Sequence, residues 1–187
     1  MKNIAVFCGS KSGQSPLFSQ AATELGSYFA QQNIRLIYGG GKVGLMGTIA
    51  DAVLNAGGEV FGVIPEKLKA KEIAHPNLTE LLVVSDMHER KAKMAELADG
   101  FIAMPGGAGT LEEISEVWTW AQLGYHQKPC AFYNINHFYD PLLQMIELMV
   151  TQGFMTQSYL DMLLVSDTPA SLIHAMQHYV PPQEKWS

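Results

Sequence analysis

Short apolar runs alternate with longer amphipathic segments along the whole chain. The runs are apolar at successive positions rather than at every second one, which is typical of parallel strands covered on both faces. The pattern predicts a single doubly wound α/β domain with a mostly parallel sheet over residues 1–180, and a loose tail over 181–187. Strands are expected at 2–9, 34–40, 59–65, 78–85, 101–104, 129–134 and 163–167, and helices at 15–32, 45–58, 86–100, 111–124, 140–153, 155–161 and 169–180.

Composition narrows the class of protein. The 187 residues are 48% apolar and 16% charged, which is enough for one sizeable core. The net charge of −6, without a basic run, disfavours nucleic-acid binding. No apolar stretch approaches the roughly 20 residues that span a bilayer, so no membrane association is expected. Met1 leads almost at once into a strand-like run, which predicts no signal peptide.

The two cysteines are isolated from each other. Cys8 and Cys130 lie in different apolar strand-like runs, so we expect buried free thiols and a reducing, cytoplasmic compartment. No Cys/His cluster has the spacing of metal ligands, so no metal site is expected.

Glycine is concentrated where three of the expected strands end. The segments are CGSKSGQS (8–15), YGGGKVGLMG (38–47) and PGGAGT (105–110), and each leads into a helix. The carboxyl ends of parallel strands share one sheet edge, and glycine-rich loops before helix N-termini let backbone N–H groups close on a phosphate. The sequence therefore predicts a phosphate-bearing ligand at this edge.

Neither familiar phosphate motif is complete. There is no G-x-x-x-x-G-K-[ST] sequence. Gly39-x-Gly41-x-x-Gly44 has the dinucleotide spacing, but it follows the second strand, and no acidic residue ends the next strand to hold a ribose. A dinucleotide is therefore disfavoured.

Thr110 and Glu113 have two interpretations. T-x-x-E is the capping-box pattern, in which Thr110 would cap a helix and Glu113 would reach back to its N–H. Capping alone does not require the preceding glycines, however. A carboxylate beside a phosphate site would repel the anion unless it were directed at a sugar instead. Both interpretations stay open at this point.

The segment DMHERKAKM (86–94) opens the helix after the fourth strand. Asp86 and Glu89 are a second candidate capping pair, and Lys93 fits a solvated helix face. For Arg90, the position at a strand end favours contact with a ligand or a carboxylate. The six histidines are scattered and form no triad with a Ser or Cys nucleophile.

These motifs together resemble one family. Residues 105–113 match the P-G-G-x-G-T-x-x-E signature of the LOG ("Lonely Guy") phosphoribohydrolases, whose members are often labelled lysine decarboxylases. CGS, YGGGKVGLMG, GVIP, MHERKAKM, WTWAQLGYHQKP and FYDPLL also occur in the family's order, so the resemblance covers nearly the whole chain. It implies a homodimeric, Rossmann-like hydrolase of the cytokinin pathway. The implied reaction cleaves the N-glycosidic bond of N6-modified adenosine 5′-monophosphates to free base and ribose 5-phosphate.

The resemblance also implies residue roles. Arg90 and Glu113 match the paired catalytic residues. Glu113 would stabilise the oxocarbenium-like ribose, while Arg90 would orient Glu113 or contact the nucleotide. Ala108 departs from the family, which often has Tyr there, and this leaves contacts with the base or at the dimer edge open. The expected substrate-binding residues are Gly9, Ser10, Gly40, Gly41, Gly44, Met46, Gly47, Glu72, Met87, Lys91, Pro105, Gly106, Gly107, Gly109, Thr110 and Thr119.

Two other functions stay open beside nucleotide hydrolysis. A non-catalytic nucleotide-binding or carrier protein would keep the glycine loops but would not need Glu113. A pyridoxal-phosphate lysine decarboxylase would need a Schiff-base lysine, and no lysine has an evident setting for one, so no cofactor is expected. AMP and N6-modified AMP both stay open as substrates. The apolar helix EISEVWTWAQLGY (113–125) is expected to offer Trp118 or Trp120 to a partner copy.

Overall fold

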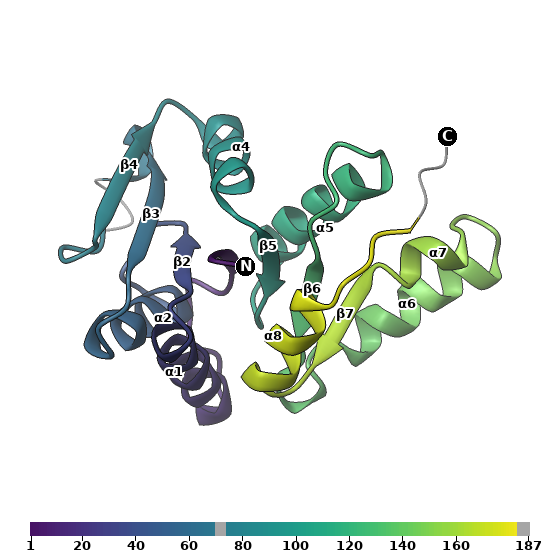
Figure 1. The fold of residues 1–187 in the computed structure, drawn as a ribbon, viewed down its shortest axis with the longest axis horizontal. Coiled ribbons are helices and arrows are strands. Elements are labelled where there is room, and N and C mark those ends of the chain that lie inside the picture. Colours follow the sequence, from purple (N-terminus) through teal and green to yellow (C-terminus); the bar gives the residue numbers. More distant parts are fainter. Residues whose placement is uncertain (70–73, 183–187) are drawn as a thin grey trace.

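The computed structural model describes residues 1–69 and 74–182 and shows one α/β domain (Figure 1). Its described part contains a seven-stranded sheet in which all neighbouring strands are parallel, in the order β4-β3-β2-β1-β5-β6-β7. This arrangement confirms the predicted doubly wound fold. The strands are β1 (Asn3–Phe7), β2 (Arg35–Tyr38), β3 (Val60–Pro65), β4 (Glu80–Val84), β5 (Gly100–Ala103), β6 (Cys130–Tyr133) and β7 (Leu163–Ser166).

Helices cover both faces of the sheet (Figure 1). One face packs against α1, α2 and α8, and the other against α4, α5, α6 and α7, so the sheet lies between two apolar cores. The short helices α3 and η1 were not predicted. The helices are α1 (Pro16–Gln31), α2 (Gly44–Asn55), α3 (Glu66–Lys69), α4 (Met87–Leu97), α5 (Ala108–Gln122), η1 (Ile135–His137), α6 (Asp140–Thr151), α7 (Gln157–Leu160) and α8 (Pro169–Gln177).

Helix α5 begins earlier than its sequence predicts. Its N-cap is Gly107, which has an extended backbone, so Thr110 lies inside the first turn and is not the cap. The capping-box interpretation of Thr110 and Glu113 is therefore wrong. The physical reason is close packing: a Cβ on Gly106 would lie only 2.8 Å from the Cβ of Thr110, so the bare glycine lets the first turn fold back against the loop.

The capping pair predicted for α4 is present. Asp86 accepts a hydrogen bond from the N–H of Glu89 at 2.9 Å. Glu89 in turn accepts from the N–H of Ser85 at 2.7 Å, one residue before the cap. The bond from the Glu89 N–H lowers the pKa of Asp86, and hydrogen bonds from the hydroxyl of Ser85 and from its N–H lower the pKa of Glu89. They fix the start of the helix that carries Arg90.

Successive strands are added on one side of β1 first and then on its other side. The chain builds outward from β1 through β2 and β3 to β4, and then resumes on the other side with β5, β6 and β7. Ligands in such sheets bind at the carboxyl ends of the strands at this switch point. The three glycine loops follow β2, β1 and β5, which are adjacent strands, so the loops lie side by side at that point.

Two general predictions can be checked on the described residues. Cys8 and Cys130 are buried free thiols, as expected, and burial raises the pKa of Cys130 to about 12. Across residues 1–69 and 74–182, no helix combines the length and the apolarity needed to cross a membrane.

Candidate active site

The three glycine loops contact one another through their backbones. The N–H of Gly9 donates to the carbonyl of Pro105 at 3.1 Å, and the carbonyl of Gly9 accepts from the N–H of Leu45 at 3.0 Å. Gly44 has a φ of +57°, and a side chain there would overlap the backbone of Ser10. Glycine is thus required at this meeting point, and part of its use is structural.

The loop after β2 is also tied to the chain that follows β3. Gly40 has a φ of +79°, and its carbonyl accepts from the N–H of His75 at 2.9 Å. Gly41 forms an antiparallel bridge with Ala74. The ring of His75 is buried, and its Nε2 lies 2.9 Å from a carboxylate oxygen of Asp51 on α2. The histidine therefore anchors residues 74–75 beside the glycine loop.

Two of the predicted substrate-binding residues have packing roles. Met46 is 9% exposed and belongs to the core under α2. A side chain at Gly47 would overlap the carbonyl of Lys42, so this glycine closes the first turn of α2. Both residues therefore support the glycine loop after β2 through packing.

A cavity of about 420 Å³ opens beside the switch point. It is lined by the loop after β1 and by Pro105, Gly106 and Gly107 of the loop after β5. Phe18 of α1 and Phe138 close its apolar side, with their rings edge to face and their centroids 5.9 Å apart. One side of the cavity is therefore formed by glycine backbone and the other by aromatic rings.

The first turn of α5 borders this cavity and is open. Ideal Cβ atoms on Gly107 and Gly109 would meet no described atom within 4 Å. Within the described chain, no side chain caps the helix. The backbone N–H groups of a helix N-terminus favour an anion. The arrangement can therefore accept a phosphate.

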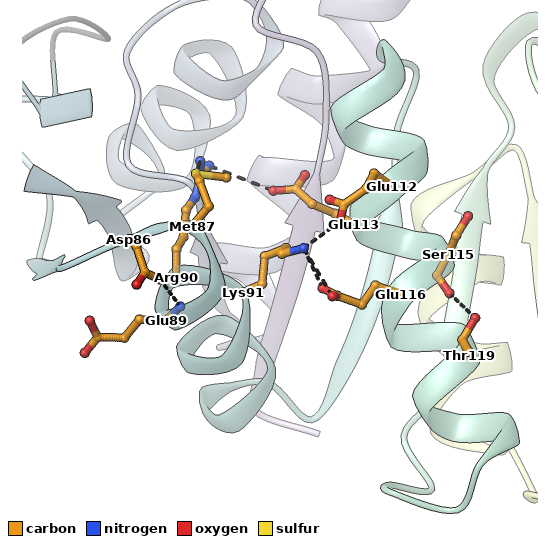
Figure 2. A network of polar contacts seen from close by, with 10 residues as sticks. All are labelled: Asp86, Met87, Glu89, Arg90, Lys91, Glu112, Glu113, Ser115, Glu116 and Thr119. Atoms are coloured by element: carbon orange, nitrogen blue, oxygen red, sulfur yellow. Dashed lines mark hydrogen bonds and ion pairs between the residues drawn. The ribbon is translucent and has the colours of Figure 1, made fainter. Parts of the chain in front are cut away.

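Arg90 and Glu113 come together across the gap between α4 and α5 (Figure 2). The arginine Nη2 lies 4.0 Å from the glutamate Oε1, and the two side chains are only 8% and 14% exposed. Arg90 Nη1 also contacts the sulfur of Met87 at 3.7 Å. Among the described residues, the buried Nε of Arg90 has no hydrogen-bond partner. The structure thus pairs the two predicted catalytic residues.

Lys91 pairs with other carboxylates of α5. Its Nζ lies 2.5 Å from Glu112 and 3.0 Å from Glu116, both on α5 (Figure 2). The hydrogen bond to Glu112 is the main cause that raises the pKa of Lys91. Lys91 was expected to bind nucleotide, whereas the structure engages it in joining α4 to α5. The neighbouring Glu112 and Glu113 therefore face different cations.

Two further predicted contacts are separate from the loops. The Oγ1 of Thr119 donates to the carbonyl of Ser115 at 2.7 Å, within α5. Thr119 is nine residues after Thr110, which places it about 13 Å farther along the helix axis. Glu72 lies outside the described residues.

Sequence reasoning did not single out several residues of the site: Gly39 beside Arg90, and the cavity-lining residues Lys11, Ser12, Gly13, Phe18, Leu45 and Phe138. Gly39 lies against the guanidinium of Arg90, and its only signal was membership in a glycine run. Phe18 and Phe138 line the cavity, but aromatic residues on a helix and in a loop carry no local signal of such a role.

The chemistry available here is that of a carboxylate, a guanidinium and an anion site. Burial and, second to it, the charge of Glu113 raise the pKa of the Cys8 thiol. In the described ranges, no three His, Cys, Asp or Glu side chains gather as a metal site would require. A negative group facing a phosphate-bound sugar suits cleavage through a cationic transition state.

Comparisons with known proteins agree with the motifs. A family model described as "Possible lysine decarboxylase" matches residues 46–176. The chain is 54% identical over 156 residues to the cytokinin riboside 5′-monophosphate phosphoribohydrolase of Rhodococcoides fascians, covering 83% of this chain and 79% of that one. It is 46% identical over 184 residues to the enzyme LOG1 of Arabidopsis thaliana, which bears the same activity name, covering 98% and 86%.

Solved structures share the fold at low sequence identity. The molybdenum cofactor binding protein of Rippkaea orientalis has a TM-score of 0.70 at 21% identity, covering 94% of this chain and 95% of that one. The Moco carrier protein of Chlamydomonas reinhardtii has the same TM-score at 19% identity, with the same coverage. These likenesses show a common fold alone. The family match and the identities above establish that the chain belongs to the LOG family, which the family model describes as possible lysine decarboxylases.

Proposed function

We propose that the protein hydrolyses the N-glycosidic bond of adenosine 5′-monophosphates, N6-modified ones included, to free base and ribose 5-phosphate. One observation carries the proposal: Glu113 and Arg90 face each other at 4.0 Å, one turn below the uncapped first turn of α5. The activity named for the relatives from Rhodococcoides fascians and Arabidopsis thaliana supports it.

In this proposal the 5′-phosphate binds at the start of α5. Gly107 and Gly109 leave its backbone N–H groups accessible, and the loop after β1 contributes Gly9 and the exposed Ser10. Holding the phosphate fixes the ribose relative to Glu113, and such positioning lowers the barrier by removing the entropy of approach.

The reaction then needs only water and the carboxylate. The bond between C1′ and the base nitrogen breaks, and its electron pair leaves with the base. The oxygen of a water molecule bonds to C1′, one proton of that water goes to the base, and ribose 5-phosphate carries the new hydroxyl. Glu113 stabilises the positive charge that develops on the ribose, as carboxylates do in other glycoside hydrolases. Arg90 holds the carboxylate in place, and neither a metal nor a redox cofactor is part of the reaction.

Schiff-base chemistry does not suit Lys91, which follows Arg90 on α4. A Schiff base forms from a neutral amine, whereas the two carboxylates that pair with Lys91 raise its pKa. The lysine therefore stays protonated at neutral pH and is a poor nucleophile. The decarboxylase description of the family model thus finds no support at Lys91.

We also propose that two copies associate through α6. The helix contains seven large apolar residues, but only Ile146 is buried. Met145 and Leu148 are about half exposed, and Tyr125 and Phe154 are 78% and 88% exposed. A second copy of the chain suits such a surface because it brings the same apolar helix.

Trp118, one of the two tryptophans expected at that interface, serves the protomer instead. It is 9% exposed, and its Nε1 donates to the carbonyl of Tyr159 at 3.1 Å. Trp120 is half-buried and stays the α5 tryptophan expected at the interface, beside the exposed residues at the C-terminal end of α5 and on α6. We further propose a cytoplasmic location, which the buried free thiols Cys8 and Cys130 support.

A substrate panel tests the proposed reaction. The purified protein is incubated with AMP, an N6-alkylated AMP, GMP and CMP, and the released bases and ribose 5-phosphate are separated by chromatography. The proposal predicts equal amounts of base and ribose 5-phosphate from at least one adenosine monophosphate. Saturable binding without release would indicate a carrier, and carbon dioxide release from lysine would indicate a decarboxylase.

A further inference from the structure

Arg90 is buried in an unusual way for a cation. Its side chain is 8% exposed, yet the nearest carboxylate among the described residues, that of Glu113, is 4.0 Å away. Its contact with the Met87 sulfur is weak, and its Nε has no hydrogen-bond partner among the described residues. Hydrogen bonds therefore do little to fix this guanidinium, and its orientation must come largely from the walls around it.

Gly39 forms one of those walls. It follows β2 directly, and its backbone lies against the planar head of Arg90. The three atoms nearest to an ideal Cβ on Gly39 all belong to that arginine: Nη2, which the Cβ would overlap, Cζ at 3.0 Å and Nε at 3.5 Å. A methyl group at position 39 would occupy the place of the guanidinium.

The backbone of Gly39 does not itself require glycine. Its φ lies outside the left-handed region, whereas the next residue, Gly40, has a φ of +79°. Gly40 is thus the residue that turns the loop. Position 39 must lack a side chain because the guanidinium of Arg90 occupies the space that a side chain would take.

We propose that Gly39 is a positioning residue for the reaction: its missing side chain leaves the space that holds the guanidinium of Arg90 opposite Glu113. The inference rests on the proposed function, in which these two residues act on the ribosyl bond. Gly39 touches no substrate atom in this account and acts through Arg90 alone.

A double-mutant cycle tests the inference. Gly39→Ala, Arg90→Ala and the double variant are compared with the wild type for kcat, KM and Tm on the best nucleoside 5′-monophosphate. We expect Gly39→Ala to lower kcat about a hundredfold, the order of loss that follows a shift of about 1 Å in a catalytic group, with KM within about threefold. In the Arg90→Ala background, the second substitution should change kcat by less than about twofold.

Stability gives an independent readout if Gly39→Ala folds poorly. Removing the arginine side chain makes room for the methyl group, so the double variant should have the Tm of Arg90→Ala. The inference is overturned by wild-type kcat in Gly39→Ala, by a loss confined to KM, or by an equal loss of kcat or Tm in the Arg90→Ala background. Arg90→Ala with wild-type activity would instead refute the catalytic assignment on which the inference rests.

Discussion

Two adjacent glutamates in the early part of α5 face different cations. Glu112 is 54% exposed and pairs with Lys91, whereas Glu113 is 14% exposed and faces Arg90. Successive helix residues differ by about 100° in direction, so the two carboxylates cannot reach the same ribose. Since α5 is capped at Gly107, capping no longer explains Glu113. A largely buried carboxylate in the second turn of a helix whose first turn has no side-chain cap in the described chain supports the proposed chemical role of Glu113.

Substitution of Glu113 by glutamine separates charge from shape. The amide keeps the size of the side chain and can still face Arg90 with its carbonyl oxygen, but it cannot stabilise a cationic ribose. We expect kcat to fall about a hundredfold or more, while Tm moves by no more than about 3 °C, which corresponds to roughly 1 kcal/mol for a domain of this size. Steady-state kinetics and thermal unfolding provide the two measurements.

Glu112→Gln is the matched control for that experiment. It removes one charge from the same turn of the helix, but the affected partner is Lys91 rather than Arg90. We expect kcat within about threefold of the wild type. Near-normal turnover by Glu113→Gln, or an inactive Glu112→Gln, would refute the assignment of the catalytic carboxylate.

At the scale of elements, the site depends on how α4 and α5 lie together. Each contributes one member of the proposed catalytic pair, Arg90 from α4 and Glu113 from α5 (Figure 2). One residue after Arg90, Lys91 joins the same two helices through Glu112 and Glu116. The lysine thus links the two helices next to the Arg90–Glu113 pair.

Lys91→Met tests this bridging role. Methionine preserves much of the apolar volume but leaves the two α5 carboxylates without their cation. We expect a loss of about 1–3 kcal/mol of stability, or about 2–12 °C in Tm, and partial recovery when Glu112→Gln and Glu116→Gln are added. A Lys91 that instead bound phosphate would, on substitution, raise KM for the monophosphate without lowering Tm.

The pKa of Lys91 determines how the difference in unfolding free energy between wild type and Lys91→Met depends on pH. Pairing raises that pKa above its ordinary value of 10.5. The stabilising contribution is therefore fully present below about pH 10 and is lost only as the pH rises through the folded-state pKa. The difference in unfolding free energy between wild type and Lys91→Met should be constant from pH 7 to 9, and denaturant titrations at those pH values can measure it.

For the whole molecule, the sequence predicted the architecture well because burial on both faces leaves a strong pattern. Continuous apolar strands and the glycine-rich segments after three of them were sufficient to place the site at one sheet edge. Tertiary contacts determined what was missed. Gly106 lets Thr110 fold inward and α5 start early, Tyr159 accepts the hydrogen bond that turns Trp118 inward, and Gly39 has a neighbour that lies 51 positions later in the chain.

The proposed dimer is a prediction at this scale. Met145→Glu with Leu148→Glu places two charges on the exposed apolar face of α6, where they cost a monomer little but would be buried without partners in a dimer. At micromolar concentration, light scattering should give the wild type twice the 20.5 kDa mass of one chain. The variant should have about the mass of a single chain. Gln20→Glu on α1, which covers the opposite face of the sheet, is the control. A monomeric wild type would contradict the proposal.

We propose that the glycine loops and the start of α5 hold a 5′-phosphate while Glu113 acts on the ribosyl bond. The most direct measurement compares kcat/KM for AMP, or its N6-alkylated form, with that for the corresponding nucleoside. Because one charge-assisted hydrogen bond contributes roughly 1.5–3 kcal/mol, loss of the phosphate should lower kcat/KM by at least about tenfold. Comparable values for nucleotide and nucleoside would contradict the account.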